Sequence, residues 1–343
     1  MSAAVLARTA TRPRPAPGVV LAAAVLLLAV LGLASLALGA RSVGWSTLLD
    51  AWLHADAADG DHAVVRARLP RTAVGVLVGL ALGLAGAVMQ GVTRNPLADP
   101  GILGVNAGAA LAVVVAIAGF GVGSVSGYVW FAFAGAAAAA VLVYAVASLA
   151  RAGATPLTLA LAGAATSAGL VSLTNGLLVV SQDTFDRYRF WALGSVAVRS
   201  WDAVLDVLPF LVVGTLVALA TARALNGLAL GEDSARSLGQ RPGVARAVAA
   251  LSVVLLCGAA TAVAGPIGFV GLVVPHAARS LVGGDHRWVL PVSAVLGAAL
   301  LVGADTVGRV LLPPTEVQAG LMTALVGAPV FVWLVRRRTA VGL

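Results

Sequence analysis

The hydrophobic positions of the chain form long, nearly continuous runs that short polar segments separate. A helix needs about 20 predominantly apolar residues to cross the hydrocarbon core of a bilayer, and unbroken runs of that length indicate membrane spans. Ten runs qualify, at roughly 18–39, 72–90, 101–119, 128–150, 157–180, 204–222, 247–264, 267–283, 289–308 and 317–335. The pattern predicts an all-α, polytopic integral membrane protein with about ten transmembrane helices.

The polar segments are too short to fold as a soluble domain. We therefore predict a basic N-terminal tail over residues 1–17 and a single transmembrane domain over 18–343. The first apolar run is longer than the core of a secretory signal, so we expect it to remain as an anchor. Composition agrees with this class, because 60% of the residues are hydrophobic and only 10% are charged.

The basic residues indicate how the chain is oriented. All 22 are arginine, the net charge is +8, and most of the arginines lie in segments that are on one side if the N-terminus is cytoplasmic. Basic residues near span ends favour the cytoplasmic side. We expect a multi-pass protein of the cell membrane with both termini in the cytoplasm. The positive charge then matches anionic membrane lipid, and no nucleic acid is expected as a partner.

Several kinds of chemistry have no residues to carry them. A phosphate-binding P-loop needs a lysine, and the sequence has none. The four histidines, His54, His62, His276 and His286, have no carboxylate at metal-ligand spacing. Two acidic residues lie inside predicted spans: Asp206, near one end of the sixth, and Asp305 in the ninth, which lies four residues before Arg309, the spacing of a helical ion pair. We predict no catalytic residues, no metal site and no cofactor on this chain.

Glycines recur every fourth residue in the second predicted span, at positions 75, 79 and 83. Such spacing leaves a smooth helix face that another backbone can approach closely. We therefore predict tight helix packing along this face.

The longest inner polar segment, 226–246, is predicted to contain a short surface helix. Gly231 can cap it, Glu232 and Asp233 suit the positive end of the helix dipole, and Glu232 is four residues before Arg236. Ala235 and Leu238 are available for packing, and Gly239 ends the helix. This segment is interpreted either as a solvated loop or as a docking element for a cytosolic partner.

Seven blocks, in order, resemble the FecCD-type permeases of ABC importers for iron-siderophore complexes, haem and cobalamin. They are "RLPRTAVGVLVGLALGLAGAVMQGVTRNPLADPGILGVNAGAA" (68–110), "LTLALAG" (157–163), "FWALGS" (190–195), "LNGLALGEDSARSLG" (225–239), "AGPIGFVGLVVPHAAR" (264–279), "GADTVGR" (303–309) and "GAPVFVWL" (327–334). Each block alone is a weak signal, whereas seven in register make a specific one.

The resemblance implies a permease subunit that pairs with a copy of itself or a related chain. Two cytosolic subunits would bind ATP and magnesium, and an extracytoplasmic binding protein would deliver an iron-siderophore or a similar metal chelate. Carried over by residue, it implies ATPase coupling by Gly231, Glu232, Asp233, Ala235, Arg236, Leu238 and Gly239, binding-protein docking by Arg68, Arg71 and Arg309, and a cytoplasmic gate at Asn95 and Leu97.

Small polar side chains of the fifth predicted span suit a weakly binding translocation path. They are Ser167, Ser172, Thr174 and Asn175, for which hydrogen bonding between helices is an equal alternative. The second half of the gate would lie near Thr155 and Leu157, where the residues do not match the family pattern.

Two other function classes remain open from the sequence. An ion-gradient-driven secondary transporter of a small solute would work without an ATPase chain, although such carriers usually place ionisable residues near the bilayer centre. A membrane scaffold or assembly factor would need neither an ATPase nor a flux of substrate.

Overall fold

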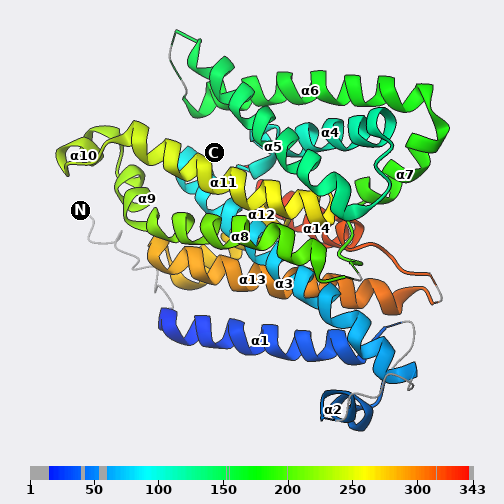
Figure 1. Ribbon diagram of the computed structural model, residues 1–343. Coiled ribbons are helices and arrows are strands. Elements are labelled where there is room, and N and C mark those ends of the chain that lie inside the picture. Colours follow the sequence, from blue (N-terminus) through cyan, green and yellow to red (C-terminus); the bar gives the residue numbers. More distant parts are fainter. Residues whose placement is uncertain are drawn as a thin grey trace.

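The computed structural model describes residues 15–39, 43–53, 60–151, 153, 155–198, 200–313 and 315–339, and these form a bundle of helices (Figure 1). The predicted tail over 1–17 lies outside the described residues except at its end. In chain order the elements are α1 (Pro17–Ala37), α2 (Trp45–Leu53), α3 (Gly60–Thr93), the 3-10 helix η1 (Pro100–Leu103), α4 (Val105–Phe120), α5 (Val125–Ser148), α6 (Pro156–Val180), α7 (Gln182–Ala192), α8 (Asp202–Ala220), α9 (Ala222–Ala229), α10 (Glu232–Ser237), α11 (Pro242–Ala264), α12 (Val270–Val282), α13 (His286–Leu311) and α14 (Ala319–Thr339).

The predicted spans coincide with helices, so the all-α membrane fold is confirmed. Among the described residues, seven helices are long and apolar enough to cross a membrane: α1, α3, α5, α6, α8, α11 and α13. The other three predicted spans correspond to the shorter apolar helices α4, α12 and α14. The chain is a multi-pass membrane protein.

Two segments between predicted spans, 40–71 and 181–203, contain helices of their own. Helices α2 and α7 lie there, and α3 begins at Gly60, well before the predicted start at residue 72. These stretches carry mixed polar and apolar residues, as in "GDHAVVRARLPR" at the start of α3. A search for apolar runs does not detect them, because charged and polar residues interrupt the apolar ones.

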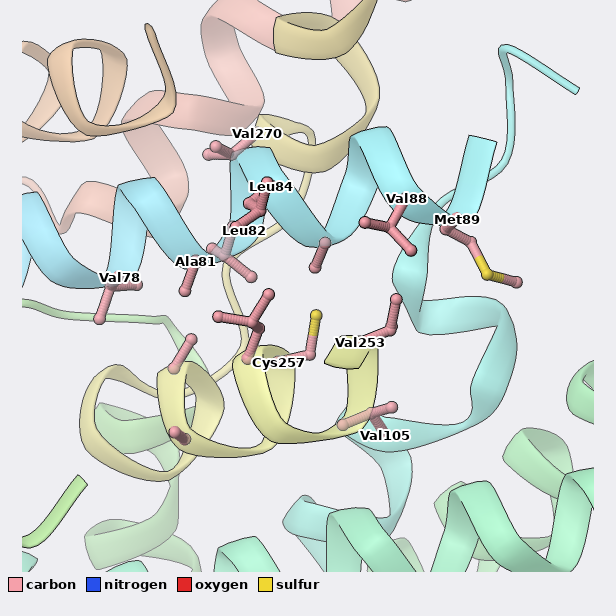
Figure 2. Close-up of a cluster of buried hydrophobic side chains, with 14 of the residues drawn as sticks. Val78, Ala81, Leu82, Leu84, Val88, Met89, Val105, Val253, Cys257 and Val270 are labelled. Carbon is pink, nitrogen blue, oxygen red and sulfur yellow. The ribbon is translucent and has the colours of Figure 1, made fainter. Parts of the chain in front are cut away.

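Helix α3 forms the centre of the bundle. Its span is 72% buried, and it packs against α13, α11 and α12. Figure 2 shows Val78, Leu82 and Val88 of α3 beside Cys257 and Val253 of α11. Cys257 is buried among these apolar side chains, which agrees with a packing role for the one cysteine.

The glycine face of α3 lies directly against α13, as predicted. A side chain at Gly79 would overlap the backbone of Gly297, and a side chain at Gly297 would overlap the backbone of Gly79. Gly83 meets the backbone of Ser293 in the same way. The two helices therefore touch backbone to backbone, with no layer of side chains between them.

Candidate coupling, gate and docking sites

Helices α9 and α10 project from one end of the bundle (Figure 1). With the turns beside them (residues 222–241) they form what we name the inner protrusion, after the cytoplasmic side on which the arginine pattern predicts it to lie. Gly231 begins α10 with φ at 104°, and Gly239 follows it with φ at 77°, conformations that favour glycine. Both predicted boundaries are confirmed, and α11 then begins at Pro242, a favoured first helical residue.

The predicted ion pair within α10 is present. Arg236 Nη2 lies 2.9 Å from Glu232 Oε2, and Arg236 Nη1 lies 2.9 Å from Asp233 Oδ1. Ala235 is completely buried, whereas the side chain of Leu238 is 64% exposed. Leu238 is therefore not used for packing within this chain and remains on the open surface of the inner protrusion.

A second arginine, from α11, fixes the position of α10. Arg246 Nη2 donates a hydrogen bond to Glu232 Oε1, so Glu232 pairs with two guanidinium groups at once. The hydrogen bond from Arg246 holds the pKa of the Glu232 carboxyl below its usual range. The first turn of α10 is thereby tied to the inner end of α11.

Asn226 of α9 connects the inner protrusion to α13. Its Nδ2 donates to Asp285 Oδ1 at 2.6 Å, and its Oδ1 accepts from the backbone N–H of His286 at 2.9 Å. Asp285 also caps α13 by accepting from the backbone N–H of Arg287 at 3.0 Å. The contacts with Arg287 and Asn226 lower the pKa of Asp285 to about 2.

A polar contact farther along the bundle joins α3 to α12. Gln90 Nε2 donates to the carbonyls of Gly271 at 3.1 Å and Leu272 at 3.2 Å. Arg279 of α12 donates to Gln90 Oε1. Side-chain hydrogen bonds thus join α3 to α12 and α9 to α13, and the short turn between α12 and α13 connects the two pairs.

The predicted gate residues lie in the turn between α3 and η1. The backbone N–H of Leu97 donates to Asn95 Oδ1 at 3.0 Å, and Ala98 donates to the Asn95 carbonyl at 3.1 Å. Such a turn is typical of Asn-Pro. Asn95 is exposed and Leu97 is half-buried, so the turn is formed and its role as a gate stays a prediction.

Helix α6 carries the predicted path residues and, together with α1, is the least covered of the seven long apolar helices among the described residues. Only 22% of its span is buried by the rest of the chain. Ser172 and Asn175 are exposed and Ser167 is half-buried, but Thr174 is buried and donates to the Leu170 carbonyl at 2.8 Å. Ser172 and Asn175 therefore have the open surface that a path or a second subunit requires, and Thr174 does not.

The predicted docking arginines belong to one cluster of charged residues: Arg68, Arg71, Asp305, Arg309 and Glu316. We name it the outer arginine cluster, after the side on which the arginine pattern predicts it to lie. Arg71 Nη2 lies 2.8 Å from Asp305 Oδ1, and Arg71 Nη1 lies 2.7 Å from Glu316 Oε2. The predicted pair of Asp305 and Arg309 is present at 3.1 Å.

Two of these arginines hold the end of α1. Arg309 Nη1 donates to the carbonyls of Ser35 at 3.0 Å and Leu38 at 3.1 Å, and Arg68 Nη1 donates to Leu36 at 2.8 Å. The last carbonyls of a helix lack partners within it, and basic side chains satisfy them well. Arg68 and Arg309 are 8% and 2% exposed, so their guanidinium groups lie inside the chain.

Sequence reasoning missed the contacts made by Arg246, Asn226 and Gln90. Their partners lie 14, 59 and 189 residues away in the chain, so no local spacing reveals them. No three His, Cys, Asp or Glu side chains are grouped for metal binding within the part of the chain that the structure describes.

Comparison with known proteins agrees with this architecture. The model of the FecCD transport family matches residues 27–337. The chain is 45% identical to the ferric enterobactin transport system permease protein FepD of Escherichia coli (strain K12), covering 97% of this chain and 98% of FepD. It is 43% identical to the probable siderophore transport system permease protein YfiZ of Bacillus subtilis (strain 168), covering 93% and 96%.

A solved structure titled as an inward-facing conformation of a putative metal-chelate type ABC transporter also matches. Its TM-score is 0.81 at 30% identity, over 94% of this chain and 99% of the other. With the family model matching most of its length and relatives similar from end to end, the chain belongs to the FecCD transport family.

Proposed function

We propose that this chain is the membrane-spanning permease subunit of an ATP-driven ABC importer for an iron-siderophore or a similar metal chelate. The relatives' names support the substrate class, because FepD is named for ferric enterobactin and YfiZ for siderophores. The observation that carries the mechanism is the inner protrusion. Two side-chain contacts, Arg246 to Glu232 and Asn226 to Asp285, tie this protrusion to long helices of the bundle.

Such an arrangement suits transmission of force from a separate chain. A displacement of α10 would be passed to α11 through Arg246 and to α13 through Asn226, because packed helices move as rigid bodies. We propose that Gly231, Glu232, Asp233, Arg236, Leu238 and Gly239 form the coupling surface, and that Ala235, which is completely buried, packs α10 against the rest of the chain. The exposed Leu238 suits an apolar contact with the ATPase subunit.

The assembly that we propose contains two permease chains, two cytosolic subunits that bind ATP and magnesium, and an extracytoplasmic binding protein. We place both termini in the cytoplasm and the outer arginine cluster on the opposite side. There three arginines face two carboxylates, so the cluster keeps an excess positive charge that would attract an acidic partner surface. Arg68 and Arg309 would support docking by fixing α1 and the position of Arg71.

The passage of cargo would need the open surface of α6 and the turn at Asn95 and Leu97. Exposed Ser172 and Asn175 offer weak polar contacts, which allow a solute to leave as readily as it enters. Because its side chain is buried, Thr174 acts as a packing residue of α6.

Reconstitution of the chain in liposomes tests the proposal. With its ATPase chain, binding protein and ATP, the complex should concentrate an iron-55-labelled siderophore. Uptake by this chain alone, driven by an ion gradient, would instead establish a secondary transporter. A chain that copurifies with neither partner and moves no solute would be a scaffold.

A further inference from the structure

Helix α2 presents an apolar row that the described part of the chain leaves open. Trp45, Leu49 and Leu53 follow one another at intervals of four, the spacing of one helix face, and their side chains are 60%, 62% and 75% exposed. The coupling, gate and docking sites use none of these three residues. Two turns of α2 therefore expose an apolar surface whose partner lies outside the described residues.

The depth of α2 is set by the end of α1. Helix α1 has 21 residues and is about 31 Å long, which matches a hydrocarbon core of about 30 Å, so Ala37 lies near one surface of that core. The backbone N–H of Val43 donates to the Ala37 carbonyl at 2.9 Å, and Leu48 is buried in one cluster with Leu36 and Ala37. Helix α2 therefore begins at the level where the hydrocarbon core ends.

Helix α3 shows which side of α2 points away from the bilayer. With 34 residues, α3 is about 51 Å long, so its first turns extend beyond the core. Ala51 is buried in one cluster with Val65, and Asp50 Oδ2 lies 3.4 Å from Nε2 of His62, which is nearer the start of α3. The side of α2 that carries Asp50 therefore points outward, along the extension of α3.

The apolar row points the opposite way. Thr47 is three residues before Asp50 and shares its side of the helix, whereas Trp45 and Leu49 are each two residues from Thr47, about 200° around the axis. Figure 1 shows α2 nearly end-on beside the end of α1, which is seen from the side. Helix α2 thus lies across the spans, with Trp45 and Leu49 directed toward the bilayer and Leu53 beside them.

This surface is continuous with the lipid-facing side of α1. Only 22% of the α1 span is buried, and Val30, Leu33 and Leu38 are exposed toward its end, where a spanning helix contacts acyl chains. Tryptophan is enriched at the boundary between membrane and water. A soluble protein approaches α2 from the outward side, so lipid is the partner that reaches the apolar row.

We propose that α2 is an interfacial helix that binds the lipid surface at the end of the bundle opposite the inner protrusion. Trp45 and Leu49 insert between the headgroups and the first methylenes of the acyl chains, and Leu53 covers the edge. Because the row carries no charge, burial of apolar area holds the helix in place. The contact keeps the start of α3, and with it Arg68 and Arg71, at a fixed height above the bilayer. This role requires only a chain that spans the membrane, so it is independent of the proposed function.

Quenching of a fluorescent label tests the interfacial helix. Cys257, the one cysteine, is replaced by Ala, and bimane is attached at Leu49→Cys or at Thr47→Cys in the full-length chain, kept in the assembly in which it is isolated, in phosphatidylcholine nanodiscs. Lipid with a nitroxide near the head of one acyl chain should quench the label at position 49 about threefold more than at position 47, because interfacial helices bury their apolar face by about 5–10 Å. Iodide in the water should quench the two labels in the reverse order.

The label at Leu33→Cys in α1 is the positive control, because the lipid nitroxide should quench it whatever α2 binds. Equal lipid quenching at positions 49 and 47 overturns the proposal. So does a label at position 49 that becomes protected from iodide only when the binding protein is added, because the row would then be a protein surface. Protection of that label from both quenchers without the binding protein overturns it as well, since another subunit of the assembly would cover the row.

A charge placed in the row gives an independent check. Leu49→Asp should release the row from the lipid, so that a label at Leu53→Cys loses most of its lipid quenching and gains iodide quenching. Thr47→Asp, on the outward side of the same helix, should change neither. If Leu49→Asp leaves the label at position 53 unchanged while the label in α1 is quenched as before, lipid does not hold α2 and the proposal fails.

Discussion

The amide side chain of Asn226 accepts a hydrogen bond from the backbone N–H of His286, 60 residues later in the chain, at 2.9 Å. This contact places α9 against the first turn of α13, one of the four helix ends that meet there. The inner protrusion is thus held by the bundle on two sides, at α13 and at α11.

Replacement of Asn226 by Ala should uncouple the protrusion from α13. We expect a loss of about 1–2 kcal/mol in stability, because a hydrogen bond to a carboxylate and one to a backbone N–H disappear, and a larger loss in the ratio of transported solute to hydrolysed ATP. Liposome uptake and ATPase rate, measured together, check this. Arg287→Ala, which removes the other partner of Asp285, should preserve the ratio; a ratio preserved in Asn226→Ala would contradict the role of this contact.

The pair of Arg246 and Glu232 lends itself to a charge exchange. Arg246→Glu should weaken retention of the ATPase subunit on an affinity column, because two carboxylates then face each other at the start of α10. The double variant with Glu232→Arg should recover most of the retention. Arg241→Gln, which alters an exposed side chain outside the coupling surface, serves as the comparison, and failure of the double variant to recover would argue against a direct pair.

Acidification should not release α10 in the physiological range. The pKa of Glu232 lies below its usual value of 4.5 in the folded chain, so its contribution to stability is complete above pH 4.5 and disappears only as the pH falls through the lowered value. Retention of the ATPase subunit should therefore be constant between about pH 5 and pH 8. A decline within that interval would have to come from another group.

Substitutions of Arg309 and Arg71 separate a structural role of the outer arginine cluster from a role in docking the binding protein. Arg309→Ala removes partners from the carbonyls of Ser35 and Leu38 and from Asp305, and we expect a destabilisation of about 3–5 kcal/mol, as for a broken buried ion pair. Arg71→Ala should lower the affinity for the binding protein more than Arg66→Ala does. Thermal unfolding in detergent and binding-protein titration separate the two effects. If Arg309→Ala unfolds at the wild-type temperature, its contacts with α1 contribute little.

A side chain on the glycine face should be far more harmful than one elsewhere in the bundle. Gly297→Ala would place a Cβ on the backbone of Gly79, and overpacking of this kind costs about 1–3 kcal/mol or more. Gly32→Ala in α1 meets no atom within 4 Å and should be neutral or slightly stabilising. Size-exclusion profiles after heating compare the two, and equal profiles would refute close packing.

The spans and the glycine face could be predicted because each depends on residues close together in the chain. An apolar run near 20 residues predicts a span, and the glycines at 75, 79 and 83 predict a packing face, without knowledge of any distant residue. The same is true of Gly231, Glu232 and Arg236, whose helix forms as expected. The family resemblance added the expected partner proteins, which composition alone does not indicate.

What could not be predicted depends on how distant helix ends meet. Arg309 was correctly paired with Asp305, but its contacts with Ser35 and Leu38 require the end of α1, 271 residues away. Residue type does not distinguish Thr174 from Ser172, because only the helices packed against α6 decide which of the two side chains is exposed. A cavity lined by Tyr128, Arg187 and Trp191 likewise arises from segments that the sequence keeps apart.

The direct backbone contact of α3 with α13 limits which parts of the molecule can serve as a hinge. Sliding one helix along another requires side chains that can exchange rotamers, and between Gly79 and Gly297 there are none. These two helices should therefore act as a stationary strut during a transport cycle. The helices that move during transport should then lie on the sparsely covered side of the bundle, around α6.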